Sequence, residues 1–169
     1  NHTKDHIRLS KMDAPKLDSE LTYIEHKCRE YDIPKPISFA YPVWNGAPYA
    51  MAVLEKRGYL FARAGGNRPY DPRVDNPYLL PSYNEAATDS MKMIQIVQQA
   101  KDGKIVVLTI HGVPDNAHEW VNTPPARVEG YMKYLYDHHY TVIAVRDLRH
   151  YVNARKAVRD LTPVFTEMK

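Results

Sequence analysis

Apolar positions along this chain either recur every three or four residues or form short continuous runs, and the first pattern predicts helices. Intervals of three and four residues place Leu21, Ile24, Cys28 and Tyr31 on the inner face of a helix that begins at Asp18 or Ser19. The same pattern, with caps and helix breakers, predicts four more helices. One spans 49–57 and is stopped by Gly58, and another spans 88–100, is capped by Thr88 or Asp89 and has Met91, Met93, Ile94 and Val97 facing inward. The last two span 124–136, opened by Pro124-Pro125, and 147–158, capped by Asp147.

Short apolar runs between these helices predict strands, over 37–40, 59–63, 104–110 and 141–145. The run 104–110 is almost continuously apolar, which is typical of a central parallel strand buried on both faces. Helices and strands alternate regularly, so we expect an α/β fold with a parallel sheet, either open or closed into a barrel. In both arrangements ligand sites lie at the carboxyl ends of the strands. Residues 65–85 hold two glycines and four prolines, and predict a long loop between strands.

Composition excludes only a few classes of function. With 169 residues, of which 44% are hydrophobic and 25% charged, the chain is expected to form a single domain over 1–169. Its net charge of +3 is small and scattered, which argues against a nucleic-acid partner, and no apolar run could cross a membrane. The single cysteine, Cys28, excludes an internal disulfide and is expected to be an inert core residue. The chain begins with Asn1 rather than Met, so we expect a processed chain or a fragment.

Three groups of residues could carry chemistry. His2 and His6 are four apart, so on a helical turn both imidazoles would share a face and could hold zinc if other ligands completed the site. Solvent-facing histidines are the alternative. His111 ends the most strand-like run, where it could act as general acid or base, or simply bond to nearby backbone.

The third group is the aromatic strand end Tyr41-Pro42 with Trp44, which could form the walls of a site but is equally expected in a core. Thirteen tyrosines and two tryptophans also suit surfaces that stack on sugars. Asp115 and Glu119 follow His111 closely and could orient an imidazole, although loop acids usually face water. The other five histidines are predicted to be structural or solvated: His26, His118, His138, His139 and His150.

Taken in order, these segments resemble the polysaccharide deacetylase family of carbohydrate esterases, whose domain is called NodB-like. Residues 1–6 resemble the family's His-Ser/Thr-x-x-His zinc motif. Residues 39–42, followed by a helix and 58–63, resemble its next strand–helix–strand unit. Residues 108–111, followed by 134–135 and 141–145, resemble its final catalytic-histidine unit. The order and spacing over about 1–152 are more specific than any single motif.

The resemblance implies a distorted (β/α) barrel with its first strands missing, and an Asp-His-His site for zinc or another divalent metal. It implies the removal of N- or O-acetyl groups from a polysaccharide such as chitin, peptidoglycan or xylan. On this reading His2 and His6 are metal ligands and His111 is the general acid. Tyr41, Pro42, Trp44 and Arg63 then contact the acetylated polysaccharide or oligosaccharide. The implied location is secreted, periplasmic or at the cell envelope, and the exposed sheet edge is expected to favour self-association.

The chain departs from the family pattern in two ways. The Thr-Phe-Asp-Asp-Gly stretch that supplies the base and the aspartate ligand is absent, and Ala40 stands where many members have an arginine, a role that we assign to Arg63 as a conjecture. Without a base, the chain as given is not expected to be an efficient catalyst. A carbohydrate-binding pseudoenzyme of the same fold is the alternative function. A purely structural α/β domain is a third, in which His2, His6 and His111 would not converge.

Overall fold

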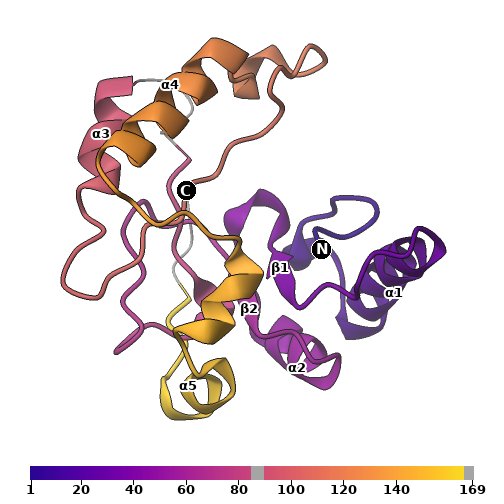
Figure 1. Cartoon of the computed structure of the whole chain (residues 1–169). Helices are drawn as coiled ribbons and strands as arrows, with labels where there is room; N and C mark the ends of the chain where they lie inside the picture. Colours follow the sequence, from indigo (N-terminus) through magenta and orange to yellow (C-terminus); the bar gives the residue numbers. More distant parts are fainter. Residues whose placement is uncertain (85–89, 166–169) are drawn as a thin grey trace. The chain divides into compact units, whose positions relative to one another are not determined.

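A computed structural model describes residues 1–84 and 90–165, and the chain divides into two compact units. The first unit comprises 1–66, 72–80 and 145–169, and the second comprises 67–71 and 81–144 (Figure 1). Each unit is described by itself below. The expectation of a single domain over 1–169 stays a prediction.

Helix α1, Ala14–Glu30, opens the first unit after a short 3-10 helix at Leu9–Lys11. The side chain of Asp13 accepts a hydrogen bond from Lys16 N at 2.9 Å, so Asp13 is the N-cap. The helix therefore begins earlier than the predicted start at 18 or 19. Leu21 is buried as predicted, but Tyr31 is 72% exposed, because the helix has already ended at Glu30.

A strand–helix–strand unit forms the centre of this unit, with β1 at Ser38–Ala40, α2 at Pro48–Lys56 and β2 at Phe61–Arg63. The strands pair in parallel, with Phe39 opposite Ala62. Single residues extend the pairing on both sides, since Ala40 N donates to Asn1 O at 2.9 Å and Leu80 N donates to Ala62 O at 2.9 Å. Strands were predicted over 37–40 and 59–63 and a parallel sheet was expected; both strands are present, over 38–40 and 61–63, and they are parallel.

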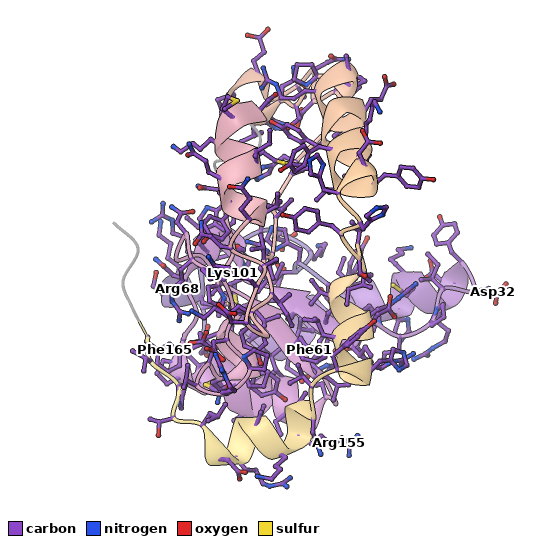
Figure 2. All side chains as sticks on the ribbon, turned by 60° about the vertical axis from the view of Figure 1, so that its left-hand side comes forward. Asp32, Phe61, Arg68, Lys101, Arg155 and Phe165 are labelled. Carbon is purple, nitrogen blue, oxygen red and sulfur yellow. The ribbon has the colours of Figure 1, made fainter. Side chains whose placement is uncertain are left out.

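A hydrophobic core lies between this small sheet and the helices α1 and α2. Phe61, labelled in Figure 2, has no exposed surface, whereas Asp32 lies beyond the end of α1 at the periphery. The buried members of the core cluster are Leu9, Leu17, Leu21, Phe39, Tyr41, Ala50, Val53, Leu54, Tyr59, Ala62, Ala64 and Tyr78.

Helix α2 ends at a glycine, as its sequence predicts. Gly58 adopts φ +78°, its N–H bonds to Glu55 O, and the N–H of Tyr59 reaches back to Leu54 O at 3.0 Å. These two hydrogen bonds together form the Schellman motif, which needs a residue in the left-handed conformation at its turn. Helix α1 ends in the same way, but with Asp32 at φ +54° in the left-handed position.

Gly58→Ala is expected to lower the free energy of unfolding by about 1 kcal/mol, because a Cβ is unfavourable at this φ. No atom lies within 4 Å of the Cβ position, so the cost is conformational rather than steric. Urea unfolding followed by circular dichroism measures the change. Asp32→Gly is the matched control, because it relieves the same strain and should not destabilise the protein. A loss of stability equal to that of Gly58→Ala would contradict the argument.

The second unit is built on α3, Ser90–Val97, and α4, Pro125–Asp137. The buried members of its core are Tyr83, Met93, Ile96, Val97, Tyr131 and Leu135. Helix α4 begins next to Pro124 as predicted. The predicted caps of α3, Thr88 and Asp89, lie outside the described residues, and Met91, predicted to face inward, is 64% exposed.

The predicted strands over 104–110 and 141–145 are wrong in this structure. Within 104–110 only Val107 is buried, and pairing is limited to isolated bridges at Ile105 with Tyr70 and at Leu108 with Tyr83. A strand needs a continuous ladder of hydrogen bonds to a neighbour, and apolar content alone does not supply one. Among residues 1–84 and 90–165 the only sheet has two strands, so an α/β fold is present and a barrel is not shown.

The last part of the chain returns to the first unit. Residues Val145–His150 form a 3-10 helix, and α5, Ala154–Asp160, is capped by Asn153, whose side chain accepts from Lys156 N at 3.1 Å. The predicted cap, Asp147, lies inside the 3-10 helix instead. The loop predicted over 65–85 is largely irregular in its described part, apart from a 3-10 turn at Pro77–Leu79. No helix in the described ranges is long and apolar enough to cross a membrane.

Candidate functional site

The imidazoles of His2 and His6 lie side by side at the carboxyl end of β1. Their ring centroids are 4.6 Å apart and the rings meet edge to face at 71°. The segment that carries them is not the helical turn that the spacing predicts. It is an irregular turn in which Thr3 and His6 adopt left-handed φ values of 65° and 52°. The two rings are brought together nonetheless.

The buried carboxylate of Glu20, on α1, stabilises this turn through hydrogen bonds. One of its oxygens accepts the N–H groups of Lys4 at 2.9 Å and Asp5 at 2.7 Å, while the other accepts Lys16 Nζ at 2.6 Å. Glu20 is only 2% exposed. Burial alone would raise its pKa, but the hydrogen bonds from Lys16 and Asp5 outweigh burial and lower the pKa below its ordinary value. The turn therefore rests on an ionised side chain of α1.

His2 is fixed in one tautomer by the main chain. Its Nδ1 lies 2.7 Å from Ala40 O, and because a carbonyl only accepts, Nδ1 must carry the proton. Nε2 then has a free lone pair, which is the state that a metal ligand needs. Partial burial lowers the pKa of His2, the bond to Ala40 opposes this, and the nearby His6 and Arg63 add to the lowering. His2 thus stays neutral down to a lower pH.

Trp44 and Arg63 form a second pair at the same end of the sheet. The guanidinium carbon lies 4.5 Å from the centre of the indole, over its face. Burial lowers the pKa of Arg63 to about 10, and its Nη1 is buried with no hydrogen-bond partner among the residues that the structure describes. The pair thus presents an unsatisfied donor, which suits an oxygen acceptor that is not among those residues.

The turn that carries Trp44 is strained. Val43 and Trp44 have φ values of 55° and 69°, and a β-branched residue rarely adopts this conformation. Backbone strain of this kind clusters at active sites, ligand clamps and switch regions. Tyr41 and Pro42 begin this turn, and both are buried. The Tyr41 hydroxyl has no partner within the described part of the chain, and burial raises the pKa of Tyr41.

His111 belongs to the second unit, where it is exposed. It begins a loop, 111–123, that is closed where Thr123 N donates to Gly112 O at 3.2 Å. Within this loop lies a pair that the sequence did not reveal as one: His118 Nδ1 is 3.1 Å from Asp115 Oδ1. Burial would raise the pKa of Asp115, but hydrogen bonds from His118 and Ala117 lower it. The spacing Asp-x-x-His could have indicated this turn, since aspartate commonly accepts amide N–H groups two and three residues ahead.

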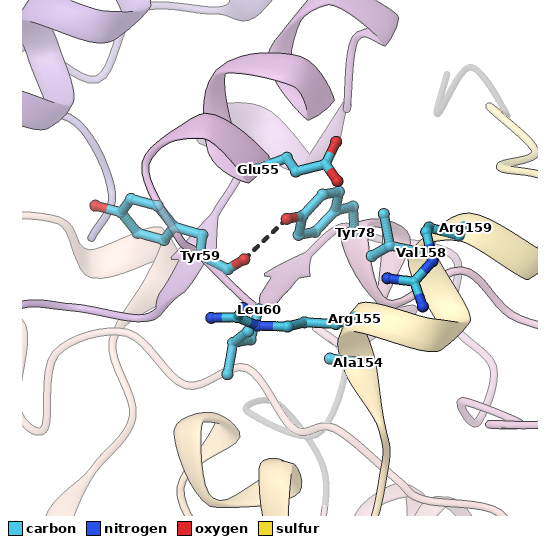
Figure 3. A pocket seen from close by; sticks show the side chains of 8 residues that line it. All are labelled: Glu55, Tyr59, Leu60, Tyr78, Ala154, Arg155, Val158 and Arg159. Atoms are coloured by element: carbon cyan, nitrogen blue, oxygen red, sulfur yellow. Dashed lines mark hydrogen bonds between the residues drawn. The ribbon is translucent and has the colours of Figure 1, made fainter.

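An open pocket lies at the other end of β2, in the first unit (Figure 3). Its volume is ≈ 150 Å³, and its lining includes Glu55 of α2 with Arg155 and Arg159 of α5. The Tyr78 hydroxyl donates to Tyr59 O at 2.8 Å in its wall. Because Tyr59 precedes β2 and Arg63 ends it, this pocket lies at the opposite end of the strand from the two histidines.

No protein-family model and no curated protein matches the chain. The fold is similar to that of a solved structure described as a "putative polysaccharide deacetylase from Mycobacterium smegmatis", with a TM-score of 0.65 and 16% sequence identity. The match covers 100% of this chain and 66% of that one, so this chain spans just under two thirds of its neighbour's length. At this identity the likeness establishes a shared α/β fold. Among the described residues no group of three or more His, Cys, Asp or Glu could hold a metal ion.

Proposed function

We propose that this chain supplies the histidine part of a metal-dependent site that removes acetyl groups from a polysaccharide. The observation that carries the proposal is the contact between the His2 and His6 rings, with His2 held in the tautomer of a metal ligand. The position of the pair at the carboxyl ends of parallel strands supports it, because ligand sites of α/β folds lie there. The likeness in fold to the M. smegmatis structure agrees at the coarse level of fold.

His2 and His6 would hold a divalent metal such as zinc through ring nitrogens. When bound, such a metal supplies Lewis acidity toward an acetyl carbonyl and toward water. The two histidines fit part of a zinc site, since zinc is usually held by three protein ligands in a catalytic centre. A carboxylate as third ligand and as base belongs to the proposal and rests on the resemblance in sequence.

Arg63 and Trp44 would position the substrate side of the site. The unsatisfied Nη1 of Arg63 can donate to a carboxylate or to a sugar oxygen, while the indole holds the guanidinium in place. Tyr41 and Pro42, which begin the Trp44 turn and are buried, would support it by their packing. The resemblance in sequence implies that His111 is the general acid, and in this proposal it would protonate the departing nitrogen or oxygen of the sugar, a reaction that an imidazole can carry out. The deacetylase-type barrel, the zinc preference and a location at the cell envelope belong to the same proposal.

A non-catalytic carbohydrate-binding protein is the second candidate. The observation in its favour is that the described residues contain two clustered histidines and no third ligand. On this reading the aromatic and arginine groups near β2 bind sugar without any hydrolysis.

Acetate release distinguishes the two functions. The longest natural form of the protein is incubated with tetra-N-acetylchitotetraose, acetylated xylan or peptidoglycan, with zinc or with EDTA. We expect zinc-dependent acetate release that EDTA removes, and a loss of about 100-fold or more in rate for His111→Ala. His150→Ala, an exposed histidine elsewhere, is the control and should leave the rate unchanged. Sugar binding with no acetate under any of these conditions would establish the binder and reject the enzyme.

A further inference from the structure

Trp120 is an exposed indole carried by the hydrogen-bonded loop 111–123 of the second unit. Its side chain is 79% exposed, yet the loop around it is tightly bonded. Two bonds close the loop across its width: Thr123 N donates to Gly112 O at 3.2 Å, and Asp115 N donates to Asn122 Oδ1 at 2.8 Å. Such a loop limits the motion of the residues at its tip.

The base of the loop admits no side chain at Gly112. A Cβ there would lie 2.5 Å from Asp115 Cβ and 2.8 Å from its Cα, so only glycine permits the two segments to approach this closely. The close approach places the Asp115 carboxylate under the tip. There it accepts the N–H groups of Ala117 at 3.1 Å and His118 at 2.9 Å.

The Asp115 carboxylate also orients the His118 imidazole, which contacts the Trp120 indole. His118 Nδ1 is 3.1 Å from Asp115 Oδ1, and the His118 ring meets the Trp120 ring edge to face, with centroids 5.3 Å apart. Trp120 itself lies in the 3-10 helix Glu119–Val121. The indole is therefore preorganised by contacts that run through His118 to Asp115. Because it is already ordered, little conformational entropy of its side chain is lost when a ligand binds to it.

The charge around Trp120 selects the ligand. Within the loop 111–123 the acidic residues are Asp115 and Glu119, and the sequence has no lysine or arginine between Lys104 and Arg127. Proteins that stack nucleobases on aromatic rings combine them with a basic groove for the phosphates, which is lacking here. A pyranose ring is neutral, presents a flat C–H face to an aromatic ring, and has hydroxyl groups that donate to carboxylates and imidazole.

We propose that Trp120, backed by His118 and Asp115, is a contact site for one pyranose unit of a polysaccharide. The choice of polymer rests on the proposed deacetylase function, whereas the stacking itself depends only on this loop. The site needs no metal and no catalysis, so it can be tested separately from acetate release.

Calorimetry with tetra-N-acetylchitotetraose and xylotetraose, in the presence of EDTA, tests the site. Trp120→Ala is expected to weaken binding by about tenfold or more, as aromatic anchors do. Tyr136→Ala is the matched control, because Tyr136 is 82% exposed on α4 and outside the loop, and it should leave the affinity unchanged. His118→Ala should weaken binding less than Trp120→Ala, since it removes the support and keeps the indole.

Fluorescence shows whether the indole is touched. The chain has two tryptophans, so Trp44→Phe leaves Trp120 as the only one, and its emission should change and saturate with the sugar. The proposal fails if neither sugar binds, if Tyr136→Ala weakens binding as much as Trp120→Ala, or if a single-stranded polynucleotide binds Trp120 in place of sugar. Sugar binding through Trp120 in a protein that releases no acetate supports this site and rejects the proposed enzyme.

Discussion

Replacing His2 and His6 together with alanine is expected to abolish the binding of one zinc ion per chain. Each single replacement should weaken binding by roughly 100-fold or more, because even the loss of a residue that only supports a ligand costs 10–100-fold. The reason is geometric, since the two rings lie within 4.6 Å and His2 already directs its protonated nitrogen to Ala40 O. Competition against a chromophoric zinc chelator at neutral pH measures the affinity.

His26→Ala is the control for this loss. His26 lies on the exposed surface of α1 and takes no part in the turn, so its removal should leave zinc affinity unchanged. The titration uses the longest natural form of the protein, which can supply the third ligand. If that form holds no zinc, or if its His26→Ala variant loses zinc as the His2→Ala and His6→Ala variants do, the assignment of His2 and His6 as ligands is contradicted.

Glu20→Ala is expected to lower the free energy of unfolding by about 2–4 kcal/mol and to weaken zinc binding with it. The change leaves the N–H groups of Lys4 and Asp5 without their acceptor and removes the buried partner of Lys16. Glu30→Ala, on the same helix, is the matched control: its ion pair with Lys27 is exposed, and such pairs contribute about 0–1 kcal/mol. Urea unfolding and zinc titration of both variants measure the difference. Equal losses in the two variants would mean that Glu20 does not support the turn.

The same carboxylate predicts a dependence on pH. Its folded pKa lies below the ordinary value of 4.5, so its contribution is present in full above pH 4.5 and is lost as the pH falls through the folded pKa. Unfolding free energies of the unaltered chain should therefore fall with acid more steeply than those of Glu20→Gln, which has no charge to lose.

Local signals in the sequence predicted the parts of the fold that depend on local physics. Gly58 was expected to stop the helix after 57, and it does so through a left-handed turn that few other residues adopt readily. The pair Pro124-Pro125 likewise opens α4 as expected, with Pro124 as N-cap and Pro125 as the first helical residue. The start of α1 was placed too late because Asp18 and Ser19 look like caps, although Asp13 followed by Pro15 is the stronger signal.

Strands were harder to predict, because their partners are distant in sequence. The segments 38–40 and 61–63 pair with each other across a single helix, and both were found. The run 104–110 has a strand's composition, yet it makes only bridges at Ile105 and Leu108. Composition shows that a segment can pair, whereas the presence of a neighbour in register decides whether it does.

The sequence likewise predicted some features of the candidate site and missed others. The spacing of His2 and His6 predicted their proximity but gave the wrong backbone, because an irregular turn brings the rings together as well as a helical one does. Glu20 has no signature in the sequence, since its partners are backbone N–H groups 15 and 16 residues away. The roles of His111, Tyr41 and Pro42 stay predictions.

The route of the chain through the two units has a consequence for its synthesis. The first unit contains 1–66 and 72–80 but also 145–169, and the Asn76 side chain donates to Leu161 O at 2.7 Å. A ribosome therefore completes all of the second unit before it releases the segment that covers Asn76 and Tyr78. Since nascent chains generally fold from the N-terminus onward, the histidine turn can form early, while the part of its unit beside α5 waits until residues 145–161 have been synthesised.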